Sequence, residues 1–285
     1  MQTNISIVTA FFDIGRGNWT PDKGHPHYLQ RSPDTYLERF GYLAQMENQM
    51  VVYTTEDMAP RVWALRSGKE DITHVIVTDP RETHVGMRDQ IVRVQTSEEF
   101  KDRLNPTQAK NPEYWNPDYV LTTDLKAYYA NLAVQDHLVT NEMVSWIDFG
   151  YCRSMANIPP SKKWVYNFNP EKIHLFDYKD YDNKPVERFV LDNDVYILGA
   201  KAVAHQNMWP HMDRLMKKSF DWLNENNLVD DDQGLWLLSY LMEKEKFEMH
   251  RIPDHQLGHD PFVLFNAFND TPGESPKNTF IYKTT

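Results

Sequence analysis

Three short apolar segments, separated by stretches with helical periodicity, set the strongest constraint on how this chain folds. They are residues 5–12, 50–54 and 73–77, each rich in β-branched or aromatic side chains. Apolar residues recur at helical spacing in 32–48 and 58–66. Because strand and helix alternate, the pattern is typical of βαβ units that build one parallel sheet. The sequence therefore predicts an α/β fold whose central, mostly parallel sheet is flanked by helices.

The rest of the chain continues this alternation less regularly. The predicted elements are helices at 97–104, 124–135, 202–226 and 233–246, strands at 143–148 and 250–252, and a β-hairpin that joins 188–191 to 195–198. Residues 105–117 carry three prolines and three asparagines and are predicted to form a loop, while 157–185 show no regular period. Without a repeat or a linker, a single domain over 1–285 is expected.

Charge and composition exclude several classes of protein. The formal net charge is −11, from 41 acidic and 30 basic residues, and no block of Lys or Arg suits a nucleic-acid partner. The single cysteine, Cys152, allows no intramolecular disulfide, which fits a reducing compartment. The first ten residues lack the basic region of a secretion signal, and no apolar run approaches the roughly 20 residues of a membrane span. We expect a soluble, cytoplasmic protein, and peripheral contact with the inner face of a membrane stays open.

The segment Trp146-Ile147-Asp148-Phe149-Gly150 is the most informative motif. An apolar strand ends in a carboxylate and a turn glycine, at the place where open α/β sheets bind ligands. A divalent metal that holds a diphosphate needs such a hard oxygen ligand. An Asp that caps a turn beside Gly150 is the alternative. The letters Asp-Phe-Gly also occur in protein kinases, but the chain lacks the kinase catalytic loop and glycine-rich loop.

Two further groups of residues are candidates for the site. Asp230, Asp231 and Asp232 precede an apolar helix, where a carboxylate could deprotonate an acceptor hydroxyl or only cap the helix. His259 lies in a histidine-bearing stretch after residue 250 and could complete a metal site by folding back. A solvated surface histidine is the alternative for His259.

Taken together, six stretches resemble the HtrL/YibB family, which occurs in bacterial surface-polysaccharide and lipopolysaccharide loci. The stretches are 9–16 (TAFFDIGR), 50–54 (MVVYT), Lys126, 146–150 (WIDFG), 198–200 (LGA) and 231–233 (DDQ). The resemblance runs from about residue 5 to residue 268. It implies a GT-A-like glycosyltransferase, with a nucleotide-binding half at about 1–150, an acceptor and catalytic half at about 151–270 and a polar tail at 271–285.

The resemblance also implies a donor site at the sheet edge. Donor contacts would fall on Thr9, Ala10, Phe11, Asp13, Arg16, Tyr53, Thr54, Asp57, Lys126, Gly150, Gly199, Ala200 and Gln233. Arg16 and Lys126 would neutralise phosphate charge, unless both are ordinary salt-bridge partners. Such folds normally carry an Asp-x-Asp motif, whereas this chain has only Asp148, so the expected ligands of Mn²⁺ or Mg²⁺ are Asp148 and His259.

The expected activity is therefore transfer of a hexose from a nucleotide-diphosphate sugar, with UDP as the expected nucleotide. The acceptor would be a lipopolysaccharide-type or capsule-type glycan, free or lipid-linked. If the reaction inverts the anomeric carbon, it requires one base, for which Asp232 is the first candidate and Asp231 the second. Two alternatives stay open from the residues, namely a metal-dependent nucleotide-sugar hydrolase and a non-catalytic glycan-binding or assembly protein on a degenerate transferase fold.

Overall fold

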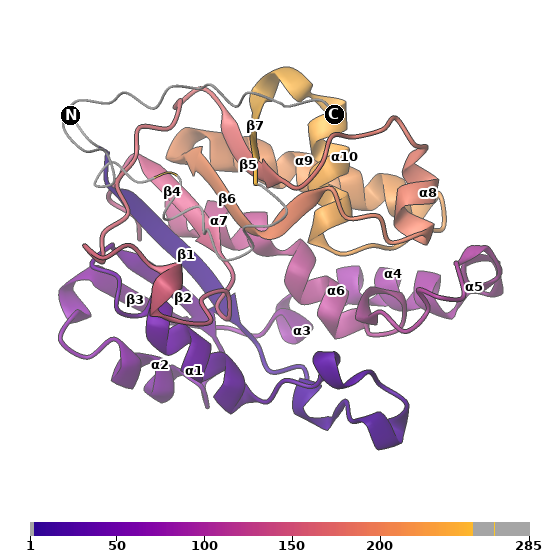
Figure 1. Cartoon of the computed structure of the whole chain (residues 1–285), viewed down its shortest axis with the longest axis horizontal. Coiled ribbons are helices and arrows are strands. Elements are labelled where there is room, and N and C mark those ends of the chain that lie inside the picture. Colours follow the sequence, from indigo (N-terminus) through magenta and orange to yellow (C-terminus); the bar gives the residue numbers. More distant parts are fainter. Residues whose placement is uncertain (1–2, 253–264, 266–285) are drawn as a thin grey trace, which may run out of the picture.

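The computed structural model describes residues 3–252 and 265, and within them seven strands form one sheet (Figure 1). The strands are β1 (Ile5–Phe11), β2 (Met50–Thr54), β3 (Thr73–Val77), β4 (Met143–Ile147), β5 (Ile173–Asp177), β6 (Ile197–His205) and β7 (Phe247–Arg251). Their order across the sheet is β3-β2-β1-β4-β6-β5-β7. Only β6 runs against its neighbours β4 and β5, while every other pairing is parallel. The predicted α/β class with a mostly parallel sheet is confirmed.

Helices cover both faces of this sheet. They are α1 (Pro33–Leu43), α2 (Ala59–Leu65), α3 (Pro80–Thr83), α4 (Val85–Thr96), α5 (Glu98–Arg103), α6 (Pro117–Asp124), α7 (Lys126–Gln135), α8 (Val186–Leu191), α9 (Trp209–Glu225) and α10 (Asp232–Met242). α1 and α2 contribute to one apolar cluster, and α4, α6, α7, α9 and α10 to the other. None of the helices in the described part of the chain is long and apolar enough to cross a membrane.

The central strand β1 is mostly apolar, with Ser6 and Thr9 as its buried polar residues. Ile5, Ile7 and Phe11 pack in the cluster with α1 and α2, whereas Val8 packs in the cluster with α7 and α9. Successive residues of a strand point to opposite faces, so a strand covered on both faces is mostly apolar and does not alternate with polar residues. This is the pattern that the run 5–12 predicts.

The start of several helices follows from capping residues. The Ser32 side chain accepts the backbone N–H of Thr35 at the start of α1, with Pro33 in the first turn. Ser97 caps α5 in the same way, as the sequence predicts. Such caps satisfy backbone N–H groups that have no partner within the helix.

The predicted β-hairpin is wrong. Residues 186–191 form α8, which begins after Pro185 and buries Phe189, Val190 and Leu191. Those apolar residues resemble a strand in sequence, but contact with the apolar cluster of α9 and α10 favours a helix. The segment 178–196, which includes α8, connects the end of β5 to the start of β6.

Four other boundaries differ from the prediction. The helix predicted at 202–226 begins only at Trp209, because 197–205 pair with β4 and β5 as β6. β5 lies inside the stretch without a regular period, and α6 begins at Pro117, the last residue of the predicted loop. The last strand spans Phe247–Arg251 rather than 250–252.

Arg66 is a buried cation that ties α2 to the neighbouring strands. Its side chain is fully buried and donates to the carbonyls of Ala44 and Met46 over 2.9 and 2.7 Å, and to Thr73 Oγ1 over 2.9 Å. Burial lowers the pKa of Arg66 to about 10, so the guanidinium is still charged at neutral pH. One side chain thus satisfies the carbonyls of the turn after α1.

We predict that Arg66→Met lowers the free energy of unfolding by about 2–4 kcal/mol, because buried carbonyls lose their donors. Urea denaturation followed by circular dichroism measures this change. The matched control is Arg61→Ala on the same helix, whose ion pair with Asp34 is exposed. An Arg66→Met variant as stable as the control would contradict the role assigned to Arg66.

Candidate functional site

A cleft lies at the edge of the sheet where β1 and β4 end. Because β6 runs in the opposite direction, its first residues meet these strand ends, and the Asp148 N–H donates to the Ala200 carbonyl over 2.9 Å. Residues of α1, α6, α7 and the start of α10 line a cavity of about 510 Å³. Open α/β sheets bind ligands at this edge, and the volume lies in the usual range of small-ligand sites.

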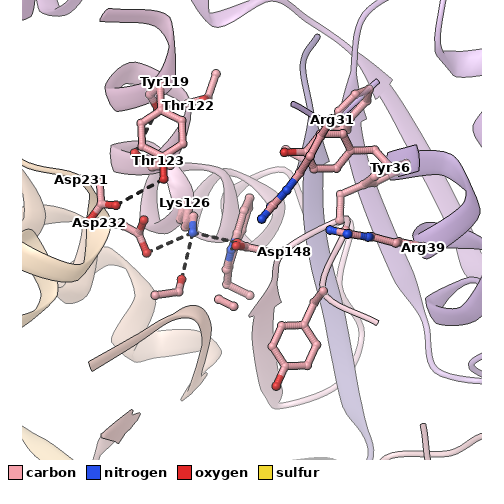
Figure 2. A pocket seen from close by; sticks show the side chains of 18 of the residues that line it. Arg31, Tyr36, Arg39, Tyr119, Thr122, Thr123, Lys126, Asp148, Asp231 and Asp232 are labelled. Carbon is pink, nitrogen blue, oxygen red and sulfur yellow. Dashed lines mark hydrogen bonds and ion pairs between the residues drawn. The ribbon is translucent and has the colours of Figure 1, made fainter. Parts of the chain in front are cut away.

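Lys126, the first residue of α7, occupies the middle of this cleft (Figure 2). Its Nζ lies 2.8 Å from Asp148 Oδ1 and 3.0 Å from Asp232 Oδ2, and it donates to the Gly199 carbonyl over 2.9 Å. Burial opposes the charged form, but the two carboxylates outweigh it and raise the pKa of Lys126 above its ordinary value. A single ammonium therefore joins β6, α10 and the turn after β4.

The prediction that Asp148 and His259 hold a metal ion is only partly testable on the described residues. Asp148 Oδ1 accepts from Trp146 Nε1 over 2.9 Å as well as pairing with Lys126. Among the residues that the structure describes, Asp148 belongs to no group of three or more potential metal ligands, and Lys126 takes the place between Asp148 and Asp232. His259 lies outside the described residues. Among the described residues, no preassembled metal site forms around Asp148, and the metal stays a prediction.

Asp231 and Asp232 begin α10 in different surroundings. Asp231 caps the helix, since its Oδ1 accepts the N–H of Gln233 over 3.0 Å, and its Oδ2 accepts the Tyr119 hydroxyl over 3.4 Å. Asp232 is only 3% exposed, and its Oδ2 has the ion pair with Lys126 but no well-directed hydrogen bond. Burial raises the pKa of Asp232, and Lys126 opposes the rise. A carboxyl with a raised pKa is suited to accept a proton.

Three more carboxyls are buried at this end of the cleft. They are Glu113 in the 3-10 helix Pro112–Tyr114, Asp124 at the end of α6, and Asp230. Burial raises the pKa of all three, and that of Glu113 to about 8, with the nearby Asp231 adding to the effect. This end of the cleft is therefore rich in carboxyl groups, and burial favours the neutral form of these three.

Two glycines allow the backbone to approach the site closely. A Cβ added to Gly199 would lie 2.1 Å from Asp232 Oδ2, and one added to Gly150 would lie 2.7 Å from the ring of Tyr36. Contacts this short do not occur between real atoms of these kinds. Any side chain at Gly199 would displace the carboxylate that pairs with Lys126.

The opposite end of the cleft is basic, which the sequence analysis missed. Arg31 and Arg39 lie there (Figure 2), and Arg153, whose charge acts on Arg39, lines the same cleft. No salt bridge joins any of the three to a carboxylate of residues 3–252. Burial, together with the charges of Arg31 and Arg153, lowers the pKa of Arg39. Like charges held this close favour a bound anion. The only local signal was their position around the first predicted helix and after Gly150, which does not distinguish them from surface arginines.

Most of the predicted site residues line this one cleft. Those that do are Ala10, Phe11, Asp13, Arg16, Lys126, Asp148, Gly150, Gly199, Ala200, Asp231, Asp232 and Gln233. The geometry thus brings residues from both ends of the chain to one place. Arg16 is buried there, and its guanidinium donates to the Leu29 carbonyl and the Tyr36 hydroxyl.

Four predicted residues do not line the cleft. Thr9 and Tyr53 are fully buried in β1 and β2. The buried hydroxyl of Thr54 donates to the Phe11 carbonyl over 2.8 Å, so Thr54 supports the end of β1. Asp57 is exposed in the turn before α2. The sequence indicates that Thr9, Tyr53 and Thr54 lie in strands and that Asp57 follows one, but not which way their side chains point.

Comparisons with known proteins agree with the resemblance in sequence. The family described as "Bacterial protein of unknown function (HtrL_YibB)" matches residues 3–268. Protein HtrL of Escherichia coli (strain K12) is 41% identical over 254 residues, which cover 88% of each chain. Among solved structures, mouse xyloside xylosyltransferase 1 in its apo form aligns with a TM-score of 0.39 and 9% identity, covering 86% of this chain and 84% of that chain.

Glu113 gives a prediction about pH. The folded protein holds a proton on Glu113 that the unfolded chain releases above its ordinary pKa of 4.5, so stability decreases as the pH rises from there to about 8. In Glu113→Gln this loss is absent. Urea denaturation at pH 5, 6.5 and 8 measures the free energy of unfolding of both proteins. The difference, variant minus wild type, should grow by up to about 1.4 kcal/mol per pH unit. Equal pH dependence of the two proteins would refute this, and Glu98→Gln, an exposed site, is the control.

Gly199 gives a prediction about packing. Gly199→Ala should lower the free energy of unfolding by about 1–3 kcal/mol, because the new methyl group overlaps Asp232. The matched control is Gly86→Ala in α4, where an added Cβ meets nothing within 4 Å. That control should be neutral or more stable by about 0.5–1 kcal/mol. Thermal and urea denaturation separate the two variants, and equal effects would show that the overlap is relieved at no cost.

Proposed function

This chain belongs to the HtrL/YibB family, and from its cleft we propose that it is a glycosyltransferase that uses a nucleotide-diphosphate sugar. The observation that carries the proposal is the separation of charge within one cleft. Arg31 and Arg39 lie at one end and Asp231 and Asp232 at the other (Figure 2), and Arg153, whose charge acts on Arg39, also lines the cleft. A nucleotide sugar has the same division, with an anionic diphosphate joined to a sugar that offers hydroxyl groups.

The basic end suits the diphosphate. Guanidinium groups bind phosphate oxygens through paired, charge-assisted hydrogen bonds, and Arg39 already lies in a field of like charges that an anion would relieve. Negative charge grows on the departing diphosphate during glycosyl transfer, so fixed cations stabilise the transition state. Arg31, Arg39 and Arg153 supply that charge from this chain alone.

The acidic end suits the sugar and its acceptor. If the reaction inverts the anomeric carbon, the acceptor hydroxyl loses its proton to a carboxylate as it attacks. Asp232 is our first candidate for that base and Asp231 the second. Lys126 fixes Asp232 against Asp148 and the Gly199 carbonyl, so the base has a defined position before the substrate binds.

The remaining assignments extend this proposal. Ala10 and Phe11 at the end of β1, with Asp13 just after it, would contact the nucleotide, while Gly150, Ala200 and Gln233 would contact the donor sugar or its phosphates. UDP is the expected nucleotide, and the expected acceptor is a lipopolysaccharide-type or capsule-type glycan, free or lipid-linked. If the acceptor is lipid-linked, the protein would work at the inner face of the membrane. Mn²⁺ or Mg²⁺, if required, would use Asp148 as one ligand.

The experiment measures thermal stability with UDP, GDP and their sugars, in EDTA and in Mn²⁺. A ligand that binds only the folded state stabilises it by about 2.7 kcal/mol at 100 times its dissociation constant. We expect a shift with a uridine nucleotide, and a dissociation constant about tenfold or more higher in Arg39→Ala, because charge-assisted hydrogen bonds are lost. Arg188→Ala, an exposed arginine outside the cleft, should bind like the wild type.

The outcomes separate the open alternatives. No shift with any nucleotide, in protein that is folded by circular dichroism, would refute the transferase and favour a glycan-binding protein. A shift in Mn²⁺ that is absent in EDTA would support the predicted metal, and equal shifts would assign charge neutralisation to the arginines. Release of free sugar at the same rate with and without acceptor glycan would favour a hydrolase.

A further inference from the structure

Three side chains with the chemistry of metal ligands meet on β5 and β7, outside the cleft. His174 lies on β5, and Glu248 and His250 lie two residues apart on β7. The two strands are parallel neighbours in which His174 pairs with Glu248. Residues two apart on a strand share a face, so Glu248 and His250 both reach His174. None of the three lines the cleft.

The distances are close to those of a tetrahedral zinc site. His174 Nδ1 lies 2.9 Å from His250 Nε2 and 3.6 Å from Glu248 Oε2, and the three ligand atoms lie within 4.8 Å of one another. With metal–ligand bonds of about 2.0–2.1 Å, tetrahedral geometry separates neighbouring ligand atoms by about 3.3–3.4 Å. The two measured spacings are within about half an ångström of this value.

A hydrogen bond on its other side orients His174 for this role. His174 Nε2 lies 2.9 Å from the Asn169 carbonyl, which can only accept, so Nε2 carries the hydrogen. The lone pair of the ring is therefore on Nδ1, which faces His250 and Glu248. Histidines that bind metals commonly have their second nitrogen fixed by a carbonyl or carboxylate in this manner.

The surroundings are apolar on one side and open on the other. His174 is fully buried, and the rings of Phe168, Phe176 and Phe265 lie 5.8, 5.5 and 4.7 Å from that of His250. The Glu248 side chain is 46% exposed, which gives an ion and one water access from solvent. An apolar wall slows the exchange of ligands, and the open side leaves a fourth position for water.

We propose that His174, Glu248 and His250 bind Zn²⁺, with water as the fourth ligand. Two imidazoles and a carboxylate are ligands that Zn²⁺ takes readily. Binding replaces the hydrogen bond between the two rings. His250 loses its proton on Nε2 to solvent and takes one up on Nδ1, so the Nε2 lone pair can bind the ion. Within the described residues β7 pairs only with β5, at the end of the sheet, so the ion fastens this strand to its neighbour.

The test uses the full chain without a histidine tag, treated with EDTA and then titrated with Zn²⁺ in a calorimeter. We expect one equivalent to bind and the melting temperature to rise by about 5 °C or more at 100 times the dissociation constant. Co²⁺ in place of Zn²⁺ should give the visible absorption of a tetrahedral site. No binding, or an octahedral Co²⁺ spectrum, would overturn the proposal.

Variants assign the site to its residues. Glu248→Gln, at an exposed position, should leave the melting temperature without metal unchanged and raise the Zn²⁺ dissociation constant about tenfold or more, as should His250→Gln. The control is His74→Gln on β3, the opposite edge strand, which should bind Zn²⁺ like the wild type. Unchanged affinity in Glu248→Gln would overturn the proposal even if His250→Gln does not fold. Neither readout involves nucleotide or sugar, so a failed glycosyltransferase proposal leaves this result intact.

Discussion

A single buried ammonium organises the cleft. Lys126 pairs with Asp148 after β4 and with Asp232 at the start of α10, and donates to the Gly199 carbonyl of β6. Without that charge, the buried carboxylate of Asp232 would face the half-buried Asp148 with no cation between them, and an unpaired buried ion costs several kcal/mol. The reversal of β6 and the absence of a side chain at Gly199 both serve this contact, because each brings the Gly199 backbone to the lysine.

The charge at one end of this cleft is opposite in sign to the net charge of the whole chain. The protein carries a net charge of −11, yet three arginines converge at one end of the cavity. Arg31 and Arg39 come from the turn-rich stretch after β1 and from α1, whereas the acids come from α10. An anion is repelled by most of the surface and attracted to one place, so binding at the arginines selects both a position and an orientation.

The sequence was sufficient for the parts of the fold that local pattern determines. β1, β2, β3 and β4 are apolar runs at βαβ spacing, and 146–150 marks the sheet edge. It was insufficient where tertiary contact decides, as for the strand β6, predicted partly as a helix, and for α8, predicted as a strand. The basic end of the cleft was not predicted, because a single sequence does not distinguish an Arg that lines a site from one that is solvated. Tyr53 belongs to the stretch 50–54 that carries the resemblance, but its side chain is buried in the core.

The connection from β5 to β6 has a consequence for how relatives of this chain could diverge. Tyr178, at its start, lines the cleft, and the Tyr178 N–H donates to the Tyr196 carbonyl at its end. Residues 178–196 thus form a connection whose two ends are hydrogen-bonded to each other beside the cleft. Changing the length of a surface loop costs little free energy, roughly 0.6 kcal/mol per doubling. Evolution can therefore rebuild this rim, and with it the shape of the cleft mouth, while the strand order and the Lys126 contacts stay as they are.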